Sequence, residues 1–289
     1  METSLWQRMQ TIDRRVIYAL LLLVIIVPIL VPSLGGAVPI IPSQQSLDFY
    51  NTIEGLAKSD PERKKLVIVD GWWAAGTRGE NQWQEQAILT HLMQRRIHFA
   101  TLSFDPQNKT LTQNIAQNLA AKYHYVYGQD YVLWGYRPQF VPTLKGISSP
   151  NGLQEAIKTD QNGTPLGQIP VMKDIKDLKD IGAIIEITPT GSLGTWIGLV
   201  QGKYNTPLLY APTAVMAPDA YPFLDSGQVS GLLTGVKGAG DYEQLTGTHT
   251  FGTRATGALS LVYALIIVFV ILGNVGYHVG RAAARREGQ

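Results

Sequence analysis

Two long apolar segments, one near each end of the chain, constrain the possible folds more than any other feature. Residues 16–34 and residues 257–278 contain no Asp, Glu, Lys or Arg. A helix needs about 20 mainly apolar residues to cross a bilayer. We therefore expect a transmembrane helix over each segment, with the chain between them folded as a separate domain.

Each apolar segment also has an alternative interpretation. Small residues at Gly35, Gly36 and Ala37 follow the first segment, as they do at the cleavage site of a signal peptide. The second segment has the length and composition of a helix buried in a protein core as well as of a membrane span. We favour two retained anchors because the first run is long for a signal peptide and the second lies at the end of the chain.

The arginines give the expected orientation. They lie in the tail 1–15, before the first segment, and in the basic tail 279–289, after the second, while the opposite flanks carry almost none. Lys and Arg are enriched on the cytoplasmic side of membrane spans. The pattern predicts a two-pass protein of the cytoplasmic (inner) membrane with both termini in the cytoplasm and the main domain periplasmic or extracellular.

The second segment also carries a helix-packing signal. Gly276 and Gly280 are one helical turn apart, and Asn274 lies beside them. Small residues at this spacing let another helix approach closely. We expect membrane lipid around the segment, and packing against the first span, a second copy or another membrane-protein subunit.

Strand-like and helix-like patterns alternate in the domain 61–246, after a linker and short amphipathic helix over 35–60. Short apolar runs bounded by turns predict strands, and apolar residues recurring every third or fourth position predict helices. Such alternation predicts an α/β fold with a mainly parallel, doubly wound (Rossmann-like) sheet, flanked here by the two membrane helices. The predicted strands are 66–69, 97–104, 131–134, 181–187 and 207–211, and the predicted helices include 81–95, 111–123, 152–158, 196–201 and a Gly-interrupted one over 220–245.

Polar residues at the ends of these strands are the candidate ligand-binding set, because ligands of open α/β sheets bind beyond the carboxyl ends of the strands. The segment Thr188–Gly194 combines hydroxyls, glycines and a helix start, as anion sites do, but it matches neither a Walker motif nor GxGxxG. Turn and helix-capping roles are the alternative for the polar residues, and packing under the neighbouring helix is the alternative for Trp72. The set is Asp70, Trp72, Thr77, Arg78, Asp105, Glu186, Thr188, Thr190, Ser192 and Thr213.

Several functional classes are excluded or disfavoured. The absence of cysteine excludes disulfides, thiolate zinc sites and a cysteine nucleophile. The five histidines have no zinc spacing and lie outside the predicted crevice loops, which disfavours zinc and Ser-His-Asp chemistry. A net charge of +2 without a central basic run gives no sign of a nucleic-acid partner. We expect no cofactor and no metal, and no residue is assigned a catalytic role.

Two functions remain after these exclusions. The first is a membrane-anchored extracytoplasmic α/β binding or interaction module, acting as a non-catalytic accessory or scaffold subunit of a membrane complex. The alternative is a membrane-tethered extracytoplasmic hydrolase that uses carboxylates at strand ends, because two acids in different environments can act as acid and base. The hydrolase requires Asp70, Asp105 and Glu186 to lie close together in a concave pocket.

Overall fold

The computed structural model describes residues 13–36 and 38–287. The chain divides into two compact units, a larger one over Ile41–Gly252 and a smaller one formed by the segments up to Ile40 and from Thr253. The larger unit contains the sheet and the candidate site. The smaller unit contains the long apolar helices.

The larger unit is built on a sheet of six parallel strands in the order β3-β2-β1-β4-β5-β6. The predicted α/β fold with a parallel sheet is therefore confirmed. The order reverses between β1 and β4, which is the switch point where doubly wound sheets open toward a ligand. The strands are β1 (Leu66–Gly71), β2 (Phe99–Ser103), β3 (Tyr131–Tyr136), β4 (Ile181–Thr188), β5 (Leu208–Pro212) and β6 (Gly231–Leu232).

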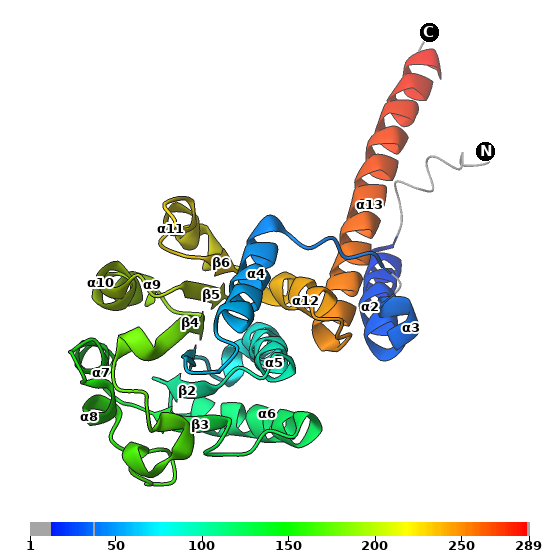
Figure 1. Cartoon of the computed structure of the whole chain (residues 1–289). Coiled ribbons are helices and arrows are strands. Elements are labelled where there is room, and N and C mark those ends of the chain that lie inside the picture. Colours follow the sequence, from blue (N-terminus) through cyan, green and yellow to red (C-terminus); the bar gives the residue numbers. More distant parts are fainter. Residues whose placement is uncertain (1–12, 37, 288–289) are drawn as a thin grey trace. The chain divides into compact units, whose positions relative to one another are not determined.

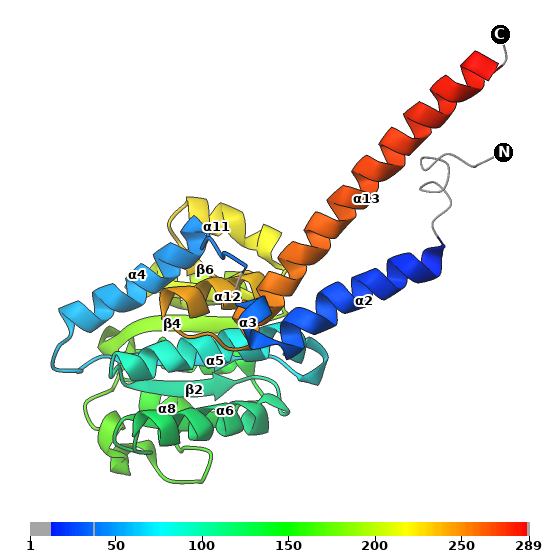
Figure 2. The ribbon, with the colours of Figure 1, turned by 90° about the vertical axis from the view of Figure 1, so that its right-hand side faces the viewer.

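Helices cover both faces of this sheet (Figure 1). Successive strand residues point to opposite faces, so Leu66 and Ile68 belong to one apolar core and Val67 and Val69 to the other. Figure 2 looks onto the face to which Val67 and Val69 point, where β2 is seen between α5 and α6. That face carries α4 (Gln44–Ser59), α5 (Arg78–Gln94), α6 (Asn108–Tyr123) and α12 (Gly235–Leu245); the other carries α7 (Phe140–Ile147), α8 (Leu153–Ile157), α9 (Leu193–Trp196), α10 (Gly202–Tyr204) and α11 (Tyr221–Asp225).

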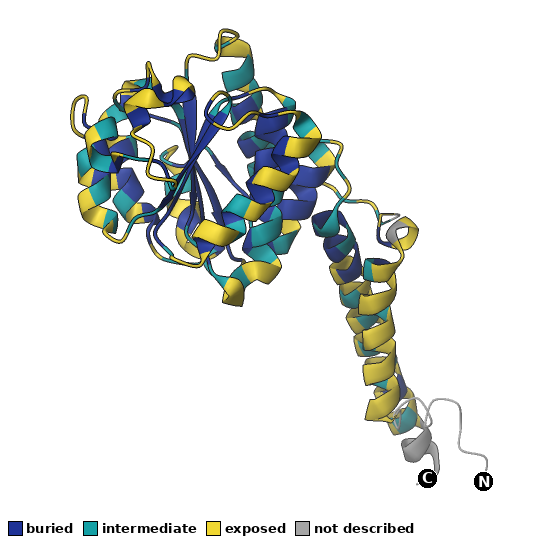
Figure 3. Cartoon of the chain, turned by 90° about the horizontal axis from the view of Figure 1, so that it is seen from below, coloured by how far each residue is buried: buried dark blue, intermediate teal, exposed yellow. Residues whose placement is uncertain are grey.

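The strands are the most buried part of the unit, as Figure 3 shows by the dark blue of the sheet. Every residue of β1, β2 and β5 is buried. A parallel sheet covered on both faces needs nearly continuous apolar strands, which explains why the sequence signal for them was strong. Polar residues inside such strands, such as Asp70 and Glu186, are consequently exceptional.

The prediction of one helix over 220–245 was wrong in part. The segment forms α11, a turn, the two-residue strand β6 and then α12. Gly231 of β6 lies against the backbone of Phe49, where a Cβ atom would come within 2.4 Å of the Phe49 nitrogen. Only glycine permits this approach, and Gly227 has a φ of 74° that ends the preceding helix. Helix α7 was not predicted at all.

The smaller unit consists of α2 (Arg14–Leu30), α3 (Pro32–Gly35) and α13 (Phe251–Glu287). Among the described residues, one helical segment, Phe251–Ala282, is long and apolar enough to cross a membrane. Helix α2 has 17 residues and includes Pro28, and it is not a second such segment. The N-terminal span therefore remains a prediction, and the tail 1–15 lies largely outside the described residues.

Within the smaller unit, the close helix contact lies at residues other than those predicted for packing. A Cβ atom on Gly257 would come within 2.3 Å of the Gly35 carbonyl oxygen, and Arg254 donates to the Ile29 carbonyl oxygen over 3.2 Å. Asn274 is exposed, and its Nδ2 donates to the Val270 carbonyl oxygen of its own helix at 2.7 Å. A packing role for Asn274, Gly276 and Gly280 remains a prediction.

Candidate functional site

Two carboxyl groups meet at the switch point of the sheet. Asp70 near the end of β1 is the register partner of Glu186 near the end of β4. Both side chains point to the face covered by α9, and both residues are 0% exposed. Asp70 Oδ2 accepts a hydrogen bond from the Trp196 indole nitrogen of α9 at 3.2 Å. We call Asp70, Glu186, Ser192 and Trp196 the buried acid cluster.

A chain of hydroxyl groups connects Glu186 to the surface loop after β4. Ser192 Oγ donates to Glu186 Oε1, and Thr190 Oγ1 lies 2.8 Å from both Ser192 Oγ and Thr188 Oγ1. Thr188 Oγ1 in turn donates to the Trp72 carbonyl oxygen at 3.1 Å. The hydroxyls of the predicted anion cradle thus bond to one another and to Glu186. Ser192 precedes α9, but its side chain makes no capping bond.

Burial controls the protonation of the acid cluster. Desolvation raises the pKa of Glu186 to about 8, partly offset by the hydrogen bond from Ser192. Desolvation, and next the charge of Glu186, raise the pKa of Asp70 well above its usual value. Within the described part of the chain, Asp70 Oδ1 and Glu186 Oε2 have no hydrogen-bond partner. Both groups therefore favour the neutral, protonated form.

A third buried carboxyl lies on the opposite face of the sheet. Glu85 of α5 accepts from the Trp73 indole nitrogen at 2.6 Å, and its other oxygen lies 2.6 Å from Thr112 Oγ1 of α6. Desolvation raises its pKa to about 7. Thr112 Oγ1 is also 2.8 Å from Asn108 Oδ1. This network ties α5 and α6 to the loop after β1.

Trp72 and Trp73 are separated by the sheet. Trp73 is buried in the core that includes α5, whereas Trp72 packs in the opposite core against Phe104 and Phe140, with ring centroids 5.4 and 4.8 Å apart. The two adjacent side chains thus contribute to different cores. Trp72 is half-buried and its ring has aromatic neighbours on the protein itself.

The other candidate residues are not assembled around the acid cluster. Asp105 belongs to the turn after β2, where its Oδ1 accepts from the Gln107 backbone at 2.7 Å. Thr77 closes the short 3-10 turn η1 (Ala75–Thr77), and Arg78 is exposed at the start of α5. Thr213 follows β5 and is buried, with no partner for its Oγ1 in the described part of the chain. Their ligand-binding roles remain predictions.

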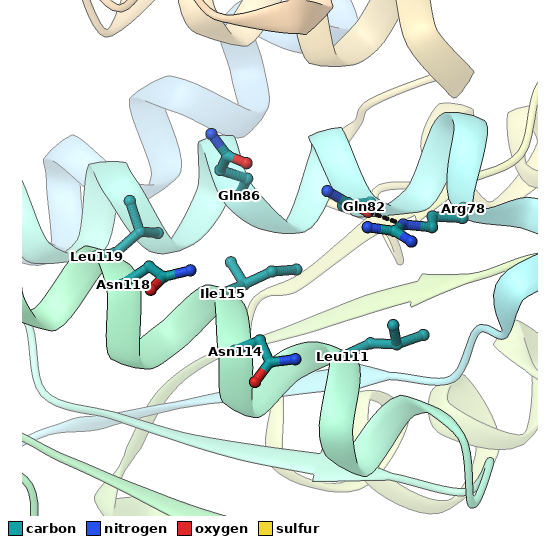
Figure 4. A pocket seen from close by; sticks show the side chains of 8 residues that line it. All are labelled: Arg78, Gln82, Gln86, Leu111, Asn114, Ile115, Asn118 and Leu119. Atoms are coloured by element: carbon teal, nitrogen blue, oxygen red, sulfur yellow. Dashed lines mark hydrogen bonds between the residues drawn. The ribbon is translucent and has the colours of Figure 1, made fainter.

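Three hollows on the surface of the larger unit lie away from the acid cluster. None of them is lined by Asp70 or Glu186, and the smallest, of about 150 Å³, lies beside Asp60 and Arg95. One of about 450 Å³ lies where the strands begin, lined by residues such as Lys65 and His98. Another, of about 320 Å³, lies between α5 and α6 (Figure 4). We call this the α5–α6 groove; its lining is Arg78, Gln82, Gln86, Leu111, Asn114, Ile115, Asn118 and Leu119.

Several residues of the buried networks and of the groove were not identified from the sequence. Glu85 lies with Asn81 and Gln84 on the buried side of α5, and polar residues at this spacing on an inward helix face indicate a buried polar network. Trp196 and the groove amides gave no comparable signal, because their importance depends on which elements become neighbours.

Among the described residues, no three His, Asp or Glu side chains are grouped so that they could hold a metal ion. In comparisons with protein-family models, curated proteins and solved structures, no match to this chain was found. Function must therefore be inferred from the geometry alone.

Proposed function

We propose that this protein is a membrane-anchored, extracytoplasmic α/β interaction module that serves a membrane complex as a non-catalytic accessory or scaffold subunit. One observation carries the proposal: the acid groups at the switch point are fully buried and line none of the described hollows. A catalytic acid or base must reach the proton that it transfers. A closed switch point favours binding through the outer surface of the domain.

The membrane part of the proposal is supported by the long apolar segment Phe251–Ala282 and by the arginines that follow it. We propose that residues 16–34 form a second anchor and that both termini are cytoplasmic. Exposed Lys122 of α6 and Lys203 of α10 report on this topology. A membrane-impermeant amine reagent should label both lysines in intact cells or spheroplasts, whereas labelling only after lysis would place the domain in the cytoplasm.

The interaction role is tested by the state of the full chain purified in a mild non-ionic detergent. We expect a stable companion subunit, or a defined oligomer, whose mass exceeds that of the monomer in light scattering. A chain that purifies alone as a monomer, and binds neither protein nor small molecule, would contradict the proposal.

A hydrolase is the second candidate because Asp70 and Glu186 are neighbours with raised pKa values and one unpartnered oxygen each. Asp105, the third acid it was expected to use, instead accepts a backbone hydrogen bond in its turn. The hydrolase predicts turnover of ester, glycoside or phosphate substrates that Asp70→Asn abolishes while the fold is retained. No turnover by the full chain across such a panel would leave the binding role as the better account.

A further inference from the structure

The α5–α6 groove has polar side chains of both helices at its edges and an apolar floor, in which Leu111 is half-buried and Ile115 and Leu119 are 8% and 9% exposed. Arg78, Gln82 and Gln86 recur every fourth residue along α5, so they share one face of that helix. On α6, Leu111, Ile115 and Leu119 repeat at the same interval, with Asn114 and Asn118 alongside. Figure 4 shows Ile115 and Leu119 pointing from α6 toward α5.

The polar side chains of the groove retain most of their hydrogen-bonding capacity. Arg78 Nε donates to Gln82 Oε1, while Gln86, Asn114 and Asn118 make no side-chain hydrogen bond within the described part of the chain. A primary amide offers two donors and an acceptor with two lone pairs. A row of amides therefore complements a peptide backbone, which presents N–H and C=O groups in alternation.

The charge of the groove is positive and unopposed. Arg78 is the one charged residue in its lining, and α6 contains Lys109 and Lys122 but no Asp or Glu. The acids of α5 are engaged elsewhere: Glu80 Oε2 accepts from the Ala214 backbone at 2.8 Å, and Glu85 is buried against Trp73. The groove is therefore complementary to a ligand that carries carboxylates.

The dimensions fit a short peptide. The stripe from Arg78 to Gln86 covers about 12 Å at 1.5 Å per helical residue, which equals about four residues of extended chain. The volume of about 320 Å³ is at the lower end of the range for ligand pockets. The lining has no aromatic ring for a sugar or base to stack on, and one arginine is too little charge for a nucleic-acid backbone.

Together these observations carry one inference, which rests on the proposed interaction role and deepens it. We propose that the α5–α6 groove binds a short, extended, acidic segment of a partner protein, one aliphatic side chain of which packs on the half-buried Leu111. Arg78 binds a carboxylate of the segment, and the amides on both edges bond to its backbone. The contact is of the weak, transient class, because the groove is small.

The test uses the full chain in non-ionic detergent and two neutral-dye-labelled pentapeptides, one alternating Glu and Leu and one alternating Lys and Leu. Fluorescence anisotropy should show saturable binding of the acidic peptide only, weakened by added salt. Arg78→Ala should reduce the affinity about tenfold, as expected for loss of a charge-assisted hydrogen bond. Lys109→Ala, which removes an exposed charge on α6 outside the groove, should change the affinity less than twofold.

A second pair of variants guards against an effect of folding. Asn118→Asp adds a carboxylate inside the groove, while Gln117→Glu adds one at the neighbouring exposed position outside it. Only Asn118→Asp should weaken binding of the acidic peptide by several-fold. Repulsion between the added carboxylate and those of the peptide falls off with distance and is screened by solvent, so Gln117→Glu should have little effect.

Three results would overturn the inference: no binding of the acidic peptide up to about 1 mM, equal binding of both peptides, or binding that Arg78→Ala and Asn118→Asp leave unchanged. If a tetramer of N-acetylglucosamine displaced the labelled acidic peptide from the groove, the groove would be assigned to a saccharide ligand instead. If the peptide fails while the full chain still purifies with a companion subunit, the interaction role stands and only this assignment of its surface is lost.

Discussion

The buried acid cluster and the α5–α6 groove are two polar regions of the larger unit that differ in what their polar groups contact. Asp70 and Glu186 are fully buried and bond to Trp196 and Ser192. The groove amides face solvent, and three of them have no intramolecular side-chain partner among the described residues. The comparison teaches that the polar residues at the strand ends, which the sequence singled out as a site, form a buried structural network, whereas the open polar surface lies on the opposite face of the sheet.

Trp196→Ala in the acid cluster is expected to cause the largest loss in the free energy of unfolding, compared with a substitution in the groove. This substitution opens a cavity and removes the donor to Asp70 Oδ2. Large-to-small changes at buried aromatics cost about 3–5 kcal/mol, so the free energy of unfolding of the full chain should fall by that amount in urea titrations followed by circular dichroism. Asn118→Ala in the groove is the matched control and should stay within about 0.5 kcal/mol. Similar losses for both would erase the distinction between the regions.

The pH dependence of stability sharpens the same comparison. Glu186 and Glu85 have pKa values raised from 4.5 to about 8 and about 7 in the folded state. Their protonated forms are favoured on folding, so this contribution is complete below pH 4.5 and is lost as pH rises through 7 and 8. Between pH 6 and 9 these two groups should lower the free energy of unfolding by about 4 kcal/mol.

Two variants assign that pH dependence. Glu186→Gln removes a titrating group from the acid cluster and should reduce the alkaline loss to the part due to the remaining buried acids such as Glu85, whereas Asp219→Asn, at an exposed acid, should leave the curve unchanged. A wild-type stability that is flat from pH 6 to 9 would contradict buried, neutral carboxyls.

How much of this was predictable depends on how local each feature is. The runs that became β1, β2, β4 and β5 were predicted because a strand buried on both faces must be apolar almost throughout. Strand β6 was missed because its two residues, one of them Gly231, carry almost no pattern. Asp70 and Glu186 were each predicted as candidates. Their pairing depends on β4 lying beside β1, which follows from the reversal in the strand order and not from any local pattern.

The groove was harder still to predict. Arg78 was singled out as a residue at the carboxyl edge of the sheet, and the structure places it at the start of α5 in the groove. Gln82, Gln86, Asn114 and Asn118 have the composition of any solvated helix face. Their juxtaposition arises only because α5 and α6 lie over neighbouring strands.

A smaller effect is expected for Ser192→Ala. It removes the donor to Glu186 Oε1 and leaves a buried oxygen without its partner, at a cost of about 1–2 kcal/mol. Because this hydrogen bond lowers the pKa of Glu186, the alkaline loss of stability should also move to higher pH. Ser149→Ala, at an exposed serine, is the control. An unchanged titration would show that Ser192 does not act on Glu186.

The smallest effect on stability is expected in the groove itself. Arg78→Ala removes an exposed side chain that, among the residues the structure describes, bonds through its side chain to Gln82 alone, so the free energy of unfolding should change by less than about 0.5 kcal/mol. A larger loss, measured in the same urea titrations, would make Arg78 a structural residue and weaken its assignment to a ligand.

The closed switch point is tested most directly by the rate at which each carboxyl group of the native full chain reacts with a water-soluble carbodiimide and an amine at pH 6. Mass spectrometry of the digested protein then gives a labelling rate for every Asp and Glu. We predict rapid modification of exposed Glu62 and Asp219, and none of Asp70, Glu85 or Glu186 until the protein is unfolded. Modification of Asp70 or Glu186 as fast as that of Asp219 would contradict the account and return the switch point to consideration as an active site.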